Sequence, residues 1–196
     1  VESMICHVAQ AVFGTLRIKH PSGREINLEG DTSKPAGQRW RRVRVTDLDP
    51  RALACARDNL ERLGLAEQVE LVPADLFPDG RAALVVCNPP WVPARPSSPI
   101  EHGIFDPESR MLREFLRALP EHLAPGGEGW LILSDLAEHL GLRPRSELLA
   151  AIDVAGLKVV DRIDARPVHP KASDEADPLH AARAAEVTSL WRLVMN

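Results

Sequence analysis

Short apolar runs and amphipathic stretches alternate along the chain from residue 43 onward. Apolar runs rich in Val, Leu and Ile predict strands at residues 43–46, 69–72, 84–87, 130–133, 157–163 and 187–195. Apolar residues at helical spacing predict helices that follow Asp49-Pro50, Asp106-Pro107 and Ser146. Strands that alternate with helices, several of them short and apolar throughout, are typical of a doubly wound, mostly parallel α/β sheet covered on both faces.

Local signals mark the ends of the expected helices. Asp49 has a side chain suited to the N-cap, and Pro50 suits the first helical position. Gly64 follows the apolar series of this helix and is expected to end it. Ser146 is expected to cap a later helix that runs to about Ala155.

The first 42 residues do not share this alternation. Residues 15–19 and 24–28 alternate around a His-Pro-Ser-Gly turn, which predicts a hairpin, and a helix is expected before it. We therefore expect an atypical N-terminal segment, residues 1–42, ahead of one domain that spans residues 43–196. Because the chain begins with Val rather than Met, this segment is compatible with a fragment, an aberrant upstream reading frame or a divergent first segment.

Length and composition suit one globular domain, because 196 residues that are 44% hydrophobic can bury a core. No apolar run approaches the roughly 20 residues of a membrane span, and the first residues lack the basic start and cleavage site of a leader. We therefore expect a cytoplasmic protein with no membrane partner. Cys6, Cys55 and Cys87 are far apart and the seven histidines lack ligand spacing, so neither a disulfide framework nor a metal site is expected.

The net charge of −4 is unevenly distributed along the chain. Residues 1–46 carry eight Lys or Arg and four Asp or Glu, a charge of +4, so the remaining 150 residues carry −8. Proteins that bind nucleic acid normally present clustered positive charge to the phosphates. Only the stretch 39–44, RWRRVR, resembles such a cluster, and we interpret it as a solvated basic edge that leads into a strand.

Polar side chains follow three expected strands. Asp47, Asp75 and Asn88 each stand where a strand ends, and ligands of doubly wound sheets bind outside these carboxyl ends. One carboxylate can accept hydrogen bonds from ribose hydroxyls and a second from an exocyclic amine, with Leu48 and Leu76 as apolar walls of an adenine slot. Each Asp could instead serve only as a cap or turn former.

The segment LVVCNPPW combines a strand end with an unusual loop. Proline supplies no backbone N–H and disfavours helix in the residue before it, so Asn88, Pro89 and Pro90 should form a stiff, extended segment. A row of acceptors beside an exposed ring, Trp91, is suited to hold a flat group that bears NH2. The simpler interpretation is a proline-rich loop that only ends a strand.

Four segments in this order, VRVTDLDPRAL, LVPADLF, LVVCNPPW and LAPGGEGWLIL, resemble class I S-adenosylmethionine-dependent methyltransferases with an Asn-Pro-Pro-aromatic motif. This group includes glutamine N5-methyltransferases and the "small" methyltransferases that act on exocyclic base nitrogens. The resemblance spans about residues 43–196. It implies a seven-stranded, mostly parallel sheet with an antiparallel C-terminal strand.

The resemblance also implies roles for particular residues. Asp47 would bind the cofactor ribose and Leu48 would line the adenine, while Asp75 and Leu76 would take the adenine amine and its other face. The acceptor nitrogen would be held by the motif, whose residues are Asn88, Pro89, Pro90 and Trp91; Asn88 would also contact the cofactor. Two acceptors that grip both N–H bonds turn the nitrogen lone pair toward the methyl group, so no titrating base is required.

One part of the family pattern has no counterpart. The family places a strand and a Gly-rich loop, acidic-x-Gly-x-Gly, before the residue that matches Asp47, but Gly23, Gly30 and Gly37 are isolated. The first strand and its loop are therefore expected to be missing or replaced. A degenerate domain that binds a partner without cofactor is the alternative to an enzyme.

Among substrates, a protein glutamine side chain is favoured over an exocyclic amine of RNA or DNA, because most of the chain is acidic. The same motif would nevertheless accept a flipped adenine.

Overall fold

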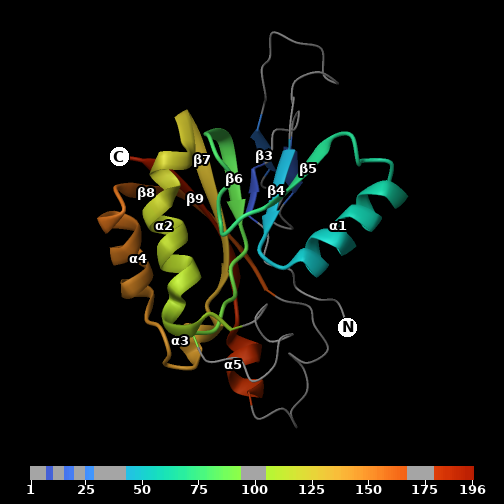
Figure 1. The fold of residues 1–196 in the computed structure, drawn as a ribbon. Helices are drawn as coiled ribbons and strands as arrows, with labels where there is room; N and C mark the ends of the chain where they lie inside the picture. The colour runs from blue at the N-terminus through green and yellow to red at the C-terminus, as the bar shows by residue number, and fades with distance from the viewer. Residues whose placement is uncertain (1–7, 11–15, 20–24, 29–42, 94–104, 167–178) are drawn as a thin grey trace.

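The computed structural model describes residues 8–10, 16–19, 25–28, 43–93, 105–166 and 179–196. Within these ranges, seven strands form one sheet in the order β5-β4-β1-β6-β7-β9-β8 (Figure 1). Their bounds are β1 Val8–Gln10, β4 Val43–Asp47, β5 Val69–Pro73, β6 Ala82–Cys87, β7 Leu123–Ser134, β8 Leu157–Ala165 and β9 Thr188–Met195. The helices are α1 Pro50–Arg62, α2 Arg110–His122, α3 Leu136–His139, α4 Arg145–Val154 and α5 His180–Ala185.

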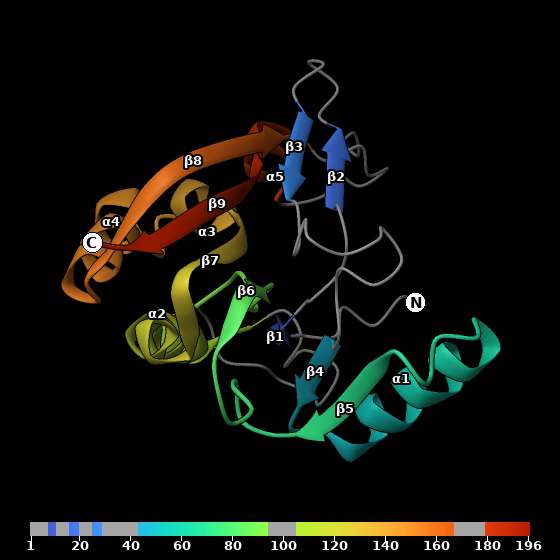
Figure 2. The same cartoon turned by 90° about the horizontal axis from the view of Figure 1, so that it is seen from above.

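Strand directions confirm the expected mostly parallel sheet with an antiparallel C-terminal strand. β4 pairs parallel with β5, and β6 pairs parallel with β7. β9 pairs antiparallel with both β7 and β8. Helices α2 and α4 lie on one side of the sheet and α1 lies on the other (Figure 2), as a doubly wound fold requires.

A three-residue antiparallel strand fills the centre of the sheet. In β1, Val8 pairs with Thr46 of β4 on one side and with Cys87 of β6 on the other. Part of the atypical first segment is therefore built into the sheet. Val8–Gln10 lies within the region where we expected a helix, so that prediction is wrong for these residues, and residues 1–7 and 11–15 lie outside the described ranges.

The predicted hairpin is present. β2 (Leu16–Lys19) and β3 (Glu25–Leu28) form a separate two-stranded antiparallel sheet, with Leu16 opposite Leu28 and Lys19 opposite Glu25. The turn between them lies outside the described residues.

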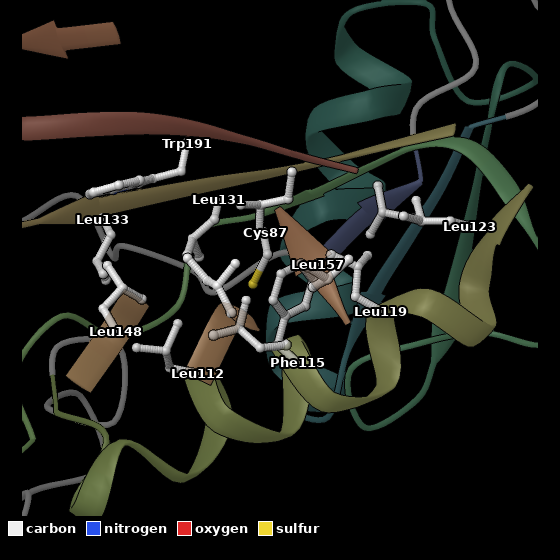
Figure 3. Close-up of a cluster of buried hydrophobic side chains, with 14 of the residues drawn as sticks. Cys87, Leu112, Phe115, Leu119, Leu123, Leu131, Leu133, Leu148, Leu157 and Trp191 are labelled. Carbon is white, nitrogen blue, oxygen red and sulfur yellow. The ribbon is translucent and has the colours of Figure 1, made fainter. Parts of the chain in front are cut away.

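The main core lies between the sheet and helices α2 and α4 (Figure 3). Leu112, Phe115, Leu116 and Leu119 of α2 recur at helical spacing and are at most 2% exposed. They pack against side chains of the strands and α4, among them Val85, Cys87, Leu131, Leu148, Leu157 and Leu193. Each such burial stabilises the fold by about 1.5–3 kcal/mol.

A glycine allows α2 to approach the sheet closely. A Cβ placed on Gly129 of β7 would overlap the side-chain atom Cδ2 of Leu119. Any larger residue would therefore force the fully buried Leu119 side chain to shift.

Helix ends agree with the sequence at two places and differ at two. Gly64, with a φ of 68°, follows the C-cap Leu63 and ends α1 as predicted. Asp49 caps α1 as predicted, since its Oδ1 accepts from the Arg51 N–H at 2.9 Å. Ser146 does not cap α4, which begins at Arg145 with Pro144 as N-cap and no side-chain cap bond; the fixed φ of proline already suits a helix entry. The second helix is preceded by a 3-10 turn, η3 Pro107–Ser109, so α2 begins at Arg110 rather than at Pro107.

None of the helices in the described part of the chain is both long enough and apolar enough to traverse a lipid bilayer.

Candidate functional site

A cavity of about 590 Å³ opens at the carboxyl ends of β4 and β5 and reaches the start of α2. This volume lies within the usual range of ligand pockets. The lining residues are Thr46, Asp47, Leu48, Asp49, Arg51, Ala74, Asp75, Leu76, Pro90, Phe105, Asp106, Pro107, Arg110 and Met111. Asp47, Leu48, Asp75 and Leu76, predicted as one site, therefore line one cavity, together with Pro90.

Asp47 is the last residue of β4, and its carboxylate shapes the turn into α1. Its Oδ1 accepts a hydrogen bond from the Asp49 N–H at 2.7 Å. No described residue bonds its Oδ2, so this oxygen can accept from a ligand. The neighbouring Asp49 has the separate capping role and pairs with Arg51 at 2.7 Å; hydrogen bonds from Arg51 hold the pKa of Asp49 below its ordinary value.

Asp75 and Leu76 form the opposite side of the cavity. Leu76 has a φ of 68°, which is unusual for a residue with a branched side chain. Its backbone carbonyl accepts from Thr46 Oγ1 at 2.6 Å, and the Phe77 N–H donates to the Asp75 carbonyl at 3.0 Å. These bonds hold the strained turn at the cavity wall, which is where strain tends to serve function.

The two predicted leucine walls differ in exposure. Leu48 is 63% exposed, whereas Leu76 also packs against the main core. An exposed leucine on a cavity wall gives a flat apolar ligand a surface to cover.

The Asn-Pro-Pro-Trp motif packs more tightly than the sequence suggested. Pro89 and Pro90 are buried, and Trp91 is half-buried against the main core. The Trp91 indole Nε1 donates to Asn88 Oδ1 at 3.0 Å. The expectation of an exposed ring is therefore wrong, because an inward-turned indole can satisfy its N–H on the Asn88 amide. Of the motif, only Pro90 lines the cavity.

Asp106 links the segment after the motif to the first turn of α2, next to the cavity. Its backbone N–H donates to the Val92 carbonyl at 2.8 Å, next to an isolated bridge between Val92 and Phe105. Its carboxylate accepts from the N–H groups of Met111 at 2.9 Å and Leu112 at 3.1 Å, so it caps α2. Sequence reasoning used Asp106 only as a helix signal and missed it as a cavity residue.

Arg110 was also missed as a site residue. Its Nη1 lies 2.9 Å from Glu114 Oε2 and 4.0 Å from Asp75 Oδ2. The guanidinium therefore lines the cavity near the Asp75 carboxylate but forms its hydrogen bond with Glu114. A sequence signal was available only in its position at the start of an amphipathic helix.

The hydrogen-bond acceptors and apolar side chains that line the cavity indicate which ligand it suits. Two carboxylates at neighbouring strand ends can accept hydrogen bonds from hydroxyl and amine groups, and Leu48, Leu76 and Met111 provide apolar contact. This arrangement fits the ribose and adenine of an adenosyl cofactor.

Comparison with known proteins agrees with this chemistry. The family model for the methyltransferase small domain matches residues 33–150. A release factor glutamine methyltransferase of Cereibacter sphaeroides is 31% identical over an alignment 136 positions long; the match covers 62% of this chain and 47% of that protein. A ribosomal RNA large subunit methyltransferase K/L of Pseudomonas paraeruginosa is 42% identical over an alignment 55 positions long; the match covers 25% of this chain and 8% of that protein.

One solved structure shows the same fold at low identity. A mitomycin 7-O-methyltransferase superposes with a TM-score of 0.52 at 17% identity, covering 82% of this chain and 43% of that one. The chain spans less than half the length of the curated relatives named above. Because the family model matches more than half of the chain, the chain belongs to the methyltransferase small domain family, within the class I S-adenosylmethionine-dependent methyltransferases.

Proposed function

We propose that this chain carries out methyl transfer from S-adenosylmethionine to a planar amide or amine nitrogen, and that a protein glutamine side chain is the preferred acceptor. The observation that carries the proposal is the single cavity shared by Asp47, Asp75 and Pro90 of the motif. We also propose residues 43–196 as the methyltransferase domain and the cytoplasm as its location.

The cavity residues would hold the cofactor through its adenosine part. Asp47 Oδ2 is suited to the ribose hydroxyls and the Asp75 carboxylate to the adenine amine, with Leu48 and Leu76 as apolar walls. When bound, S-adenosylmethionine supplies an electrophilic methyl group on a sulfonium.

The motif residues would orient the acceptor nitrogen. Asn88 Oδ1 has two lone pairs, and the Trp91 indole occupies one of them, so the second can accept a substrate N–H. The indole bond also fixes the orientation of the amide. The Pro89 carbonyl would take the other N–H. Holding the nitrogen in this way can supply up to about 7–11 kcal/mol of the barrier reduction.

Charge supports a protein substrate. The 150 residues after Thr46 carry −8, and a negative surface repels a phosphate backbone. The glutamine methyltransferase named above acts, by its name, on a release factor, whereas the ribosomal RNA methyltransferase matches a shorter stretch. An exocyclic base amine is the alternative acceptor.

Two measurements test the proposal. Calorimetry of the chain with S-adenosylmethionine should show binding that Asp47→Ala weakens. Tritiated S-adenosylmethionine and the separated protein and nucleic acid fractions of a bacterial lysate should then give label in protein. Label confined to nuclease-sensitive material would overturn the glutamine assignment. No binding and no transfer would indicate a cofactor-free binding module instead.

A further inference from the structure

Arg143 is a buried arginine that joins three distant parts of the chain. It lies in the connection between α3 and α4, is 4% exposed, and its backbone N–H donates to the Ala137 carbonyl at 3.2 Å. Its Nη1 donates to Ser109 Oγ at 3.0 Å, and its Nη2 donates to the Trp91 carbonyl at 3.3 Å. The guanidinium therefore bridges the motif and the start of α2.

This charge is held without a close counter-charge. No described carboxylate forms an ion pair with Arg143, and its burial lowers the pKa of the guanidinium, against the opposing effect of Asp106, Glu147 and Glu138. A buried cation of this kind is costly, and an apolar side chain of similar volume would often be more stable. The cost of burying this cation is offset in part by its hydrogen bonds to Ser109 and to the Trp91 carbonyl, so its placement depends on these two partners.

The two acceptors of Arg143 are themselves special. Ser109 and the preceding Glu108 both have positive φ, 53° and 57°, so the chain enters α2 through two left-handed residues. The Trp91 carbonyl belongs to the residue whose indole holds the Asn88 amide. Arg143 reaches the two acceptors from two separate nitrogens of one planar fork, whereas a lysine would have to bond both from a single nitrogen.

We infer that Arg143 is a positioning residue for methyl transfer: its guanidinium fixes Trp91 against the start of α2, and Trp91 in turn orients Asn88. The inference rests on the proposed role of Asn88 in holding the acceptor nitrogen. Asp106 adds a second tie between the same two segments through the Val92 carbonyl.

The first test does not require activity. In 15N-labelled protein, the indole N–H of Trp91, assigned by its loss in Trp91→Phe, should exchange about tenfold faster in Arg143→Met and in Arg143→Lys. The indole of Trp130, which donates to Glu128 Oε2 at 2.8 Å, is the internal control and should not change. Arg145→Met is the matched control, because Arg145 pairs with Asp135 and Glu138 instead. An unchanged Trp91 signal, or equal changes at Trp91 and Trp130, would overturn the inference.

The second test separates positioning from binding. With tritiated S-adenosylmethionine and the lysate fraction that accepts label, Arg143→Met should lower kcat about 3- to 10-fold, as loss of one hydrogen bond would, while KM for S-adenosylmethionine changes less than twofold. Arg143 lines a cavity of about 410 Å³ between α2 and α4, so methylguanidinium can enter in its place. Added methylguanidinium should restore part of the kcat of Arg143→Ala, whereas added methylammonium should not.

Asn88→Ala shows whether a negative result contradicts the positioning role of Arg143 or the proposed function itself. If Asn88→Ala keeps full activity, the proposed role of the motif fails, and the indole exchange alone decides whether Arg143 holds Trp91. If Asn88→Ala is inactive while Arg143→Met keeps its kcat, the positioning role is overturned and the proposed function stands.

Discussion

The indole nitrogen of Trp91 lies 3.0 Å from Asn88 Oδ1 and donates a hydrogen bond to it. Two residues of one tetrapeptide thus hold each other across two buried prolines. The aromatic ring is packed against the core and not offered as an open surface. Its effect on chemistry is therefore expected to pass through the Asn88 amide.

If Asn88 orients the acceptor nitrogen as proposed, replacing it by Ala should reduce methyl transfer by about two orders of magnitude or more. Affinity for S-adenosylmethionine, measured by calorimetry, should stay nearly unchanged. A matching loss of affinity and of turnover would show that Asn88 serves binding and not orientation.

Trp91→Phe should keep most of the core packing and remove only the indole N–H. One uncharged hydrogen bond contributes about 0.5–1.5 kcal/mol, so turnover should fall about 3- to 10-fold with a small loss of stability. Steady-state kinetics and urea unfolding of the same samples check this. Full activity in Trp91→Phe would mean that the Asn88 amide is held by other contacts.

Asp47→Ala should weaken S-adenosylmethionine binding by about 1.5–3 kcal/mol, the usual contribution of hydrogen bonds to a charged group. Asp47→Asn removes the negative charge but keeps the shape of the side chain, because the Asn Oδ1 can still accept from the Asp49 N–H. Asp49→Ala is the comparison: it removes the α1 cap, so it should lower the melting temperature, and because Arg51 engages the Asp49 carboxylate, affinity should fall much less than in Asp47→Ala.

The same calorimetry bears on the missing Gly-rich loop. If the first segment has replaced that loop, the unmodified chain should bind S-adenosylmethionine weakly. Micromolar affinity would show that the segment with β1 at the sheet centre is competent.

Glu128 should make stability depend on pH. Burial opposes its ionisation, but hydrogen bonds from Arg192, at 2.6 and 2.8 Å, and from Trp130 outweigh it, so the pKa of Glu128 lies below its ordinary value. A lowered folded-state pKa stabilises the protein above the ordinary Glu pKa, and this contribution is lost as pH falls through the folded-state value.

Glu128→Gln should therefore cost about 1–2 kcal/mol at pH 7, and the difference from wild type should shrink as pH falls below about 4, the ordinary range for Glu. Urea unfolding of both proteins at a series of pH values measures this difference in the free energy of unfolding. A difference that stays constant at every pH would show that packing, not charge, is responsible.

Gly129→Ala should destabilise the protein by about 1–3 kcal/mol, because the new Cβ overlaps Leu119. Leu119→Ala alone should cost about 2–5 kcal/mol by leaving a cavity. In the double variant the added methyl group occupies part of that space, so its cost should be less than the sum. Additive costs would contradict the contact between Gly129 and Leu119.

Much of the fold could be predicted because its signals are local. The runs that predicted strands at 69–72 and 84–87 agree with β5 and β6 to within two residues at each end. Asp49 and Pro50 act as predicted, since an N-cap depends on neighbouring backbone N–H groups. The strand-end positions of Asp47 and Asp75 placed them on one cavity, because parallel neighbouring strands bring their carboxyl ends together.

Only the tertiary structure decided how distant segments meet. The antiparallel β1 at the sheet centre, the inward turn of Trp91 and the bridge from Arg143 to Ser109 and Trp91 depend on partners 34 or more residues away or on space in the core. A side chain of arginine or aspartate can form several hydrogen bonds, and the single indole N–H of tryptophan can donate to many kinds of acceptor, but the sequence does not say which partner will be near. That choice is made when strands pair and helices pack, because only then is each buried donor confined to the acceptors around it.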